Sequence, residues 1–173
     1  MSWKIYKGRC LVIAHRGDTK AAPENTLAAM ESALKMGVDG VETDLQLTRD
    51  GVLVLFHDEA LKRLAGIQNS IGKMDLHEVK KVRVGGHSIP TLEELLDLAK
   101  DKILLNLEIK TISCRNAVME RSLIKTLHSF RLNDSILVSS FHPLPLWRLK
   151  RMEPGLARGY LFRKLSQFAH VPK

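Results

Sequence analysis

Two acidic residues, Glu42 and Asp44, are separated by one residue in a segment that alternates apolar and polar side chains. In a β-strand, residues two apart point to the same face, so the two carboxylates would lie side by side. Carboxylates this close repel each other unless a cation holds them, and oxygen ligands favour a hard ion, Mg²⁺ or Ca²⁺. Glu108, in a later strand, can complete the ligand set. The alternative is that Glu42, Asp44 and Gln46 form the solvated face of a strand.

Two histidines, His15 and His57, each follow a short apolar run that predicts a buried strand. Histidine exchanges a proton near neutral pH, so the pair can supply one general base and one general acid. Arg16 and Lys110 add cationic donors, and the planar guanidinium of Arg16 suits phosphate oxygens. A structural role at the end of a strand is the alternative for a lone histidine. Together with a divalent cation, these residue types suit the cleavage of a phosphodiester.

The elements that would position these residues alternate between strands and helices. Strand patterns are found at residues 10–14, 41–48, 52–56, 103–107, 136–138 and 155–162. Helical patterns are found at residues 23–37, 91–99, 117–130 and 143–152. An Asp-Gly turn at 50–51 is typical of a hairpin between the second and third strands. Strands separated by helices predict a parallel α/β sheet, which places functional residues at the carboxyl ends of its strands.

Periodicity alone does not distinguish a closed barrel from an open sheet. Residues 59–90 have no clean strand pattern and carry scattered glycines and basic residues. We therefore expect an inserted segment there, between the third strand and the helix that begins near Thr91.

Composition and charge exclude several other classes of protein. The 173 residues are 45% hydrophobic and 27% charged, which excludes disorder, collagen and coiled coil for the whole chain. No apolar run approaches the length of a membrane span, and the run at 10–14 is too short for a signal peptide, so we expect a cytoplasmic protein. The formal net charge of +8 is carried by residues 115–173, where the bases are spread singly, so we expect no nucleic-acid partner.

Several short motifs, taken in order, resemble those of the glycerophosphodiester phosphodiesterase family. The matching segments are IAHRG (13–17), PENT (23–26), ETD (42–44), HD (57–58), IPTLEE (89–94), EIK (108–110) and SF (140–141). The resemblance covers residues 11–162. Its specificity lies in the combination and order of the motifs, since each one alone is weak.

The resemblance implies a TIM (β/α)8 barrel with a family insertion at 59–90 after the third strand. It also implies one divalent cation, Mg²⁺ or Ca²⁺, and a set of site residues: the metal ligands Glu42, Asp44 and Glu108, the acid/base pair His15 and His57, and the phosphate contacts Arg16 and Lys110. The family cleaves glycerophosphodiesters to an alcohol and glycerol 3-phosphate, and some relatives act on lysophospholipids. The identity of the base and of the attacking hydroxyl stays open at this point.

The length of the chain predicts an incomplete barrel. A TIM barrel has eight strands in about 250 residues, whereas about six strands are predicted here before Lys173. We expect residues 1–173 to be a C-terminally truncated domain, with a natural short form or a homo-oligomer that covers the open barrel edge as alternatives. A truncated inactive form that binds a metal, a phosphate or a partner is the alternative to an enzyme. The basic C-terminal segment leaves a membrane-surface lipid substrate open.

Overall fold

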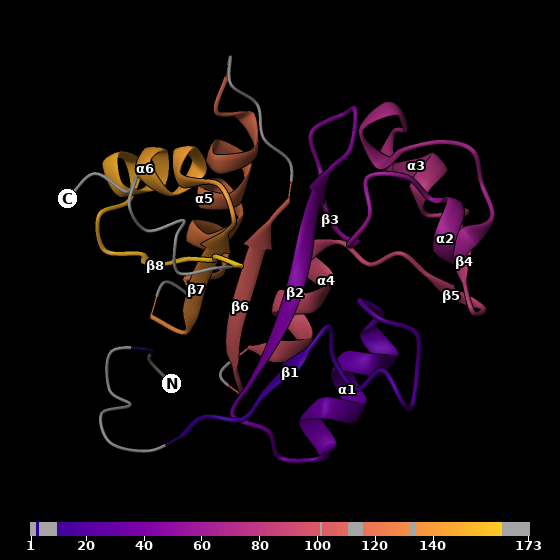
Figure 1. The fold of residues 1–173 in the computed structure, drawn as a ribbon, viewed down its shortest axis with the longest axis horizontal. Coiled ribbons are helices and arrows are strands. Elements are labelled where there is room, and N and C mark those ends of the chain that lie inside the picture. Colours follow the sequence, from indigo (N-terminus) through magenta and orange to yellow (C-terminus); the bar gives the residue numbers. More distant parts are fainter. Residues whose placement is uncertain (1–2, 4–9, 101, 111–115, 132–133, 164–173) are drawn as a thin grey trace.

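A six-stranded sheet forms the centre of the computed structural model, which describes residues 3, 10–100, 102–110, 116–131 and 134–163. Its strands are β1 (Ile13–His15), β2 (Gly40–Leu47), β3 (Leu53–Leu55), β6 (Leu104–Ile109), β7 (Ile136–Ser140) and β8 (Ala157–Tyr160). Five of them are parallel neighbours in the order β1-β2-β6-β7-β8 (Figure 1). This succession of parallel strands with intervening helices is an incomplete (β/α)8 barrel.

The third predicted strand has a different place from the other five. The Asp50-Gly51 turn reverses the chain, with Gly51 at a φ of 85°, and β3 pairs antiparallel with the end of β2. Because β2 pairs directly with β6 from Gly40 to Leu45, β3 lies beside the far end of β2. All six predicted strands are therefore present, but only five of them belong to the parallel order of the barrel.

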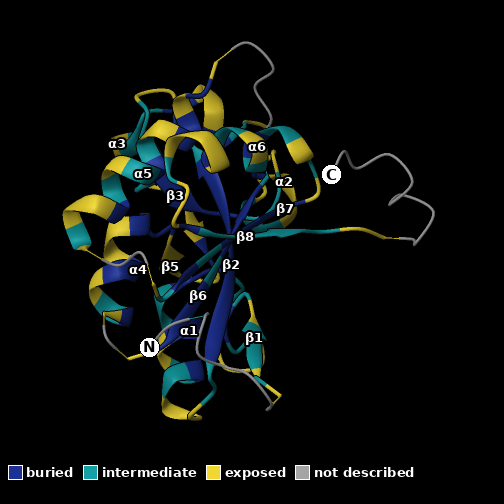
Figure 2. Cartoon of the chain, turned by 90° about the vertical axis from the view of Figure 1, so that its left-hand side faces the viewer, coloured by how far each residue is buried: buried dark blue, intermediate teal, exposed yellow. Residues whose placement is uncertain are grey.

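Four longer helices pack next to one another along the sheet, in chain order. They are α1 (Leu27–Lys35), α4 (Leu92–Ala99), α5 (Val118–Phe130) and α6 (Pro143–Met152). Thr26 caps α1, and Thr91 with Glu94 forms a capping box at the start of α4. Figure 2 shows the strands as largely buried and the helices with exposed outer faces. Among the described helices, none has both the length and the apolar composition needed to cross a membrane.

The main hydrophobic core lies between the sheet and these helices. From β2 it contains Val41 and Leu45, with Leu47 packed against it, and β6 adds Leu105 and Leu107. The alternate residues of both strands point to the other face of the sheet. The alternation of apolar and polar residues that the sequence shows at 41–48 therefore gives β2 one apolar face and one face that carries the candidate site.

Residues 59–90 form a small lobe with its own buried cluster. The lobe contains α2 (Lys62–Ala65), the 3₁₀ helix η1 (Ile71–Lys73), α3 (Leu76–Val79) and a hairpin of β4 (Arg83–Val84) and β5 (His87–Ser88). Its cluster includes Leu61, Ile71 and Val79, which are completely buried against Val54 and Phe56 of the β3 region. The sequence showed no strand pattern here because each of the two strands has only two residues.

We expect Ile71→Ala to destabilise the protein by about 2–5 kcal/mol, because it removes a completely buried side chain from the small core of the lobe. Ile67→Ala is the matched control, since Ile67 is exposed in the same lobe and its truncation leaves no cavity. Urea denaturation of both variants measures the free energies of unfolding. Equal stabilities of the two variants would contradict an independent core in the lobe.

Candidate active site

Three carboxylates meet on the face of the sheet opposite the main core. The parallel register of β2 and β6 places Asp44 beside Glu108, and Glu42 lies two residues earlier on β2. Ligand oxygens of all three lie within 4.8 Å of one another. The three residues are 7%, 0% and 7% exposed for Glu42, Asp44 and Glu108. The predicted cluster is therefore present, and this burial contradicts the alternative of a solvated strand face.

Burial makes it costly to ionise all three carboxylates of this cluster. Burial, with Asp44 and Glu108 close by, raises the pKa of Glu42 to about 8. No described residue donates a hydrogen bond to Glu42 Oε1 or Asp44 Oδ1, although both atoms are buried. Buried acceptors without donors are costly. Three converging carboxylates with free oxygens fit a hard divalent cation, so this cluster could hold a metal ion.

Lys110 brings a positive charge to the cluster from the end of β6. Its Nζ lies 2.8 Å from Glu108 Oε1 and 3.6 Å from Asp44 Oδ1. The same ammonium lies 6.0 Å from the centre of the Phe141 ring. Because the side chain is mostly buried, this charge acts on the carboxylates at low dielectric.

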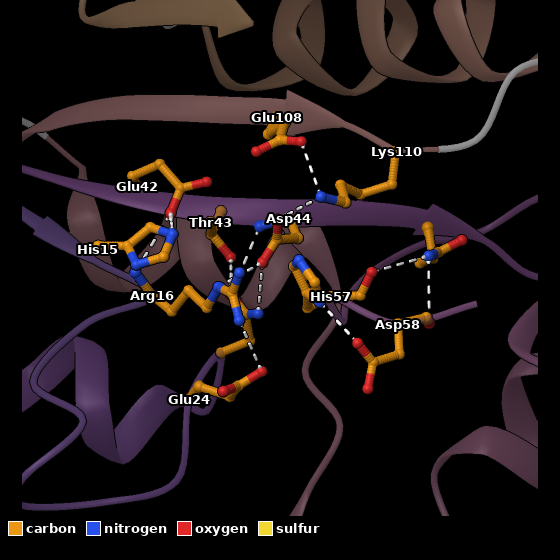
Figure 3. Close-up of polar contacts among 12 residues, drawn as sticks. His15, Arg16, Glu24, Glu42, Thr43, Asp44, His57, Asp58, Glu108 and Lys110 are labelled. Carbon is orange, nitrogen blue, oxygen red and sulfur yellow. Dashed lines mark hydrogen bonds and ion pairs between the residues drawn. The ribbon is translucent and has the colours of Figure 1, made fainter. Parts of the chain in front are cut away.

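Arg16 approaches the cluster from the end of β1. Its backbone, at a φ of 59°, turns so that its N–H donates to the carbonyl oxygen of Glu42 at 2.9 Å. Its Nε lies 3.2 Å from Asp44 Oδ2, and Nη1 donates to Glu24 Oε1 at 3.1 Å. The guanidinium thus lies between two carboxylates (Figure 3).

Asn25 is a site residue that the sequence analysis missed. It is almost completely buried, at a φ of 58°. Its Nδ2 donates to Asp44 Oδ2 at 2.9 Å, and its Oδ1 accepts from Thr43 Oγ1 at 2.7 Å. It therefore orients one of the three carboxylates. One feature of the sequence could have indicated this role: Asn25 directly precedes Thr26, the cap of α1. Asparagine tolerates the left-handed backbone region better than most residues, so it can occupy a tight turn at such a position.

The two predicted histidines approach the cluster from opposite sides (Figure 3). His15 is largely exposed, and its Nε2 lies 3.6 Å from Glu42 Oε2. His57 is partly buried, and its Nδ1 lies 2.6 Å from Asp58 Oδ1. Both histidines line one cavity of about 390 Å³, together with Arg16, Glu42, Asn106, Glu108, Lys110, Phe141, Leu161 and Arg163. The structure thus brings the predicted site residues to one cavity, except for the buried Asp44, which is not one of the residues that line it.

Comparisons with known proteins agree on one family. The model of the glycerophosphoryl diester phosphodiesterase family matches residues 15–170. A glycerophosphodiester phosphodiesterase of Caldanaerobacter subterraneus subsp. tengcongensis is 40% identical over 164 residues, which cover 90% of this chain and 68% of that protein. One from Bacillus altitudinis is 36% identical over 155 residues, which cover 84% of this chain and 63% of that protein.

Solved structures give the same result. An Oleispira antarctica phosphodiesterase, in complex with the product sn-glycerol-3-phosphate, matches with a TM-score of 0.83 and 32% identity. The match covers 92% of this chain and 70% of that one. The chain thus spans about two thirds of the length of the relatives it matches.

We expect Mg²⁺ or Ca²⁺ to bind more tightly as the pH rises towards 8 and to release protons on binding. Below a pKa of about 8, Glu42 keeps its proton in the metal-free protein, and a cation must displace it. Titration calorimetry at pH 6.5 and 8.5, in buffers of different ionisation enthalpy, measures the affinity and the protons released. Glu42→Gln should abolish the proton release. An affinity that does not change with pH would contradict this account.

We expect Asn25→Gly to weaken cation binding by roughly 10- to 100-fold, as is typical when a residue that orients a metal ligand is lost. Glycine adopts the positive φ of Asn25 without strain, so this variant tests only the lost hydrogen bonds to Asp44 and Thr43. Asn25→Ala adds backbone strain and should also lower the melting temperature further. Unchanged cation affinity in Asn25→Gly would show that Asp44 needs no orientation by residue 25.

Proposed function

This chain belongs to the glycerophosphoryl diester phosphodiesterase family, and we propose that it hydrolyses a glycerophosphodiester to an alcohol and glycerol 3-phosphate. The observation that carries the proposal is the buried cluster of Glu42, Asp44 and Glu108 beside two histidines in one cavity. The product found in the Oleispira antarctica phosphodiesterase supports glycerol 3-phosphate as the phosphate-containing product.

Glu42, Asp44 and Glu108 are the proposed ligands of one divalent cation, Mg²⁺ or Ca²⁺. When bound, such a cation neutralises charge on the phosphoryl oxygens. The residues fit it because two of their buried oxygens lack donors among the described residues. Lys110, and Arg16 after a rearrangement away from Glu24, would contact the remaining phosphate oxygens.

His15 and His57 are the proposed acid/base pair. An oxygen nucleophile attacks phosphorus and loses its proton to one imidazole, while the bond from phosphorus to the alcohol oxygen breaks and the other imidazole protonates that oxygen. The positions of the histidines on opposite sides of the cluster support this division (Figure 3). Because Nδ1 of His57 is bonded to Asp58, Nε2 is the nitrogen that is available to move a proton.

A lysophospholipid is the second candidate substrate. Two of the residues that line the cavity, Phe141 and Leu161, are apolar, and Phe141 is exposed. An acyl chain could lie against these residues while the phosphodiester lies over the carboxylates. Such an activity would be of the lysophospholipase D type, with the same acid/base pair and the same cation.

We expect the chain to release glycerol 3-phosphate from glycerophosphocholine only when Mg²⁺ or Ca²⁺ is present. A coupled glycerol 3-phosphate dehydrogenase assay, with and without EDTA, measures this release. Cleavage of lysophosphatidylcholine at the same bond would leave lysophosphatidic acid instead, so the release of choline, measured with choline oxidase, tests the second substrate. His15→Ala and His57→Ala should each lower kcat by about 100- to 10,000-fold. His87→Ala is the matched control, because His87 is exposed on the hairpin of the lobe.

Full activity of both site variants would contradict the proposed acid/base pair. Cation binding without hydrolysis of either substrate would instead support an inactive form that binds metal or phosphate.

A further inference from the structure

A single arginine of the lobe, Arg63 on α2, contacts two carboxylates that flank the candidate site. Its Nε donates to Asp58 Oδ2 at 2.5 Å. Its Nη2 donates to Glu24 Oε1 at 2.6 Å, and its Nη1 lies 3.3 Å from Glu24 Oε2. One planar guanidinium therefore connects the residue after His57 with the segment before α1.

The first arm of this contact acts on His57. The hydrogen bond from Arg63 lowers the pKa of Asp58 and outweighs the effect of its partial burial. An ionised carboxylate can only accept hydrogen bonds. In its 2.6 Å contact with Asp58 Oδ1, His57 Nδ1 must therefore be the donor. The ring is held in one orientation, with a proton on Nδ1, and Nε2 makes no hydrogen bond to any residue that the structure describes.

The second arm reaches the carboxylate cluster. Glu24 Oε1, which accepts from Arg63, also accepts from Arg16 Nη1 at 3.1 Å. Arg16 Nε in turn lies 3.2 Å from Asp44 Oδ2. The contacts thus form one continuous path from His57 through the lobe to a proposed metal ligand. Burial favours the neutral form of Glu24, but both arginines outweigh it and lower its pKa.

We propose that Arg63 is a positioning residue of this site, through which the lobe fixes the orientation of the His57 ring by way of Asp58. The inference rests on the proposed function in one respect, namely that His57 transfers a proton during hydrolysis. Half-exposed ion pairs contribute little to stability. Removal of Arg63 should therefore change catalysis much more than folding.

The first test compares Arg63→Ala with Arg49→Ala. Arg49 is a close control, because its guanidinium also forms a fork with a carboxylate, Asp75, at 2.8 and 2.6 Å, and it does not line the cavity. We expect Arg63→Ala to lower kcat by about 10- to 100-fold with KM within threefold, since small misplacement of a reacting group has effects of this size. Added guanidinium should restore part of the loss, and Arg49→Ala should resemble the wild type.

A double-mutant cycle shows whether Arg63 acts through Asp58. In the Asp58→Asn background, Arg63→Ala should lower kcat by less than threefold further. If Arg63→Ala lowers kcat by the same factor in the Asp58→Asn background as in the wild type, the proposal is overturned, because Arg63 would then act by a route other than Asp58.

A spectroscopic readout separates this inference from the proposed function. The ¹⁵N shifts of the His57 ring, measured without substrate, should show one tautomer with hydrogen on Nδ1 in the wild type and in Arg49→Ala. Arg63→Ala should give averaged shifts of two tautomers. If the wild type hydrolyses no phosphodiester but Arg63→Ala still changes these shifts, the proposed function fails and the positioning role stands. Unchanged shifts in Arg63→Ala would overturn the positioning role, whatever the activity.

Discussion

The repulsion among three buried carboxylates is the constraint on which the arrangement of this site depends. Hydrogen-bonded pairing of β2 with β6 fixes Asp44 beside Glu108, and the side-chain alternation of the strands adds Glu42 on the same face. The surrounding residues reduce the cost of this placement: Lys110 and Arg16 supply positive charge, and Asn25 supplies a neutral donor. Two oxygens still lack donors among the described residues. The cluster could therefore hold a metal ion.

The features that the sequence predicted are those that follow from local rules. Alternation placed Glu42 and Asp44 on one face, and the strand ends placed His15, His57 and Lys110 near them. The helical pattern at 91–99 predicted α4, whereas the pattern at 23–37 placed the start of α1 four residues before Leu27, where the helix begins. The Asp-Gly turn predicted a hairpin, although periodicity did not show that β3 would leave the parallel order of the barrel.

The residues that the sequence analysis missed depend on contacts between distant segments. Asn25 acts on Asp44, nineteen positions later, and it does so from a left-handed backbone conformation. Arg63 contacts Glu24 across thirty-nine positions, from a helix of four residues without a clear periodic pattern. Neither residue type indicates by itself which residue it will contact, because donor and acceptor come together only in the folded chain. The lobe was predicted as an insertion, but its own core was not.

The antiparallel direction of β3 has a consequence for the tolerance of this site to change. The distance from Asp44 to His57 is set within one hairpin, since Phe56 N–H donates to the Asp44 carbonyl oxygen. Because His57 directly follows Phe56, one residue inserted between the two would move the imidazole away from the carboxylates. Variation in length can therefore accumulate in the lobe, beyond Arg63, but not in this short stretch.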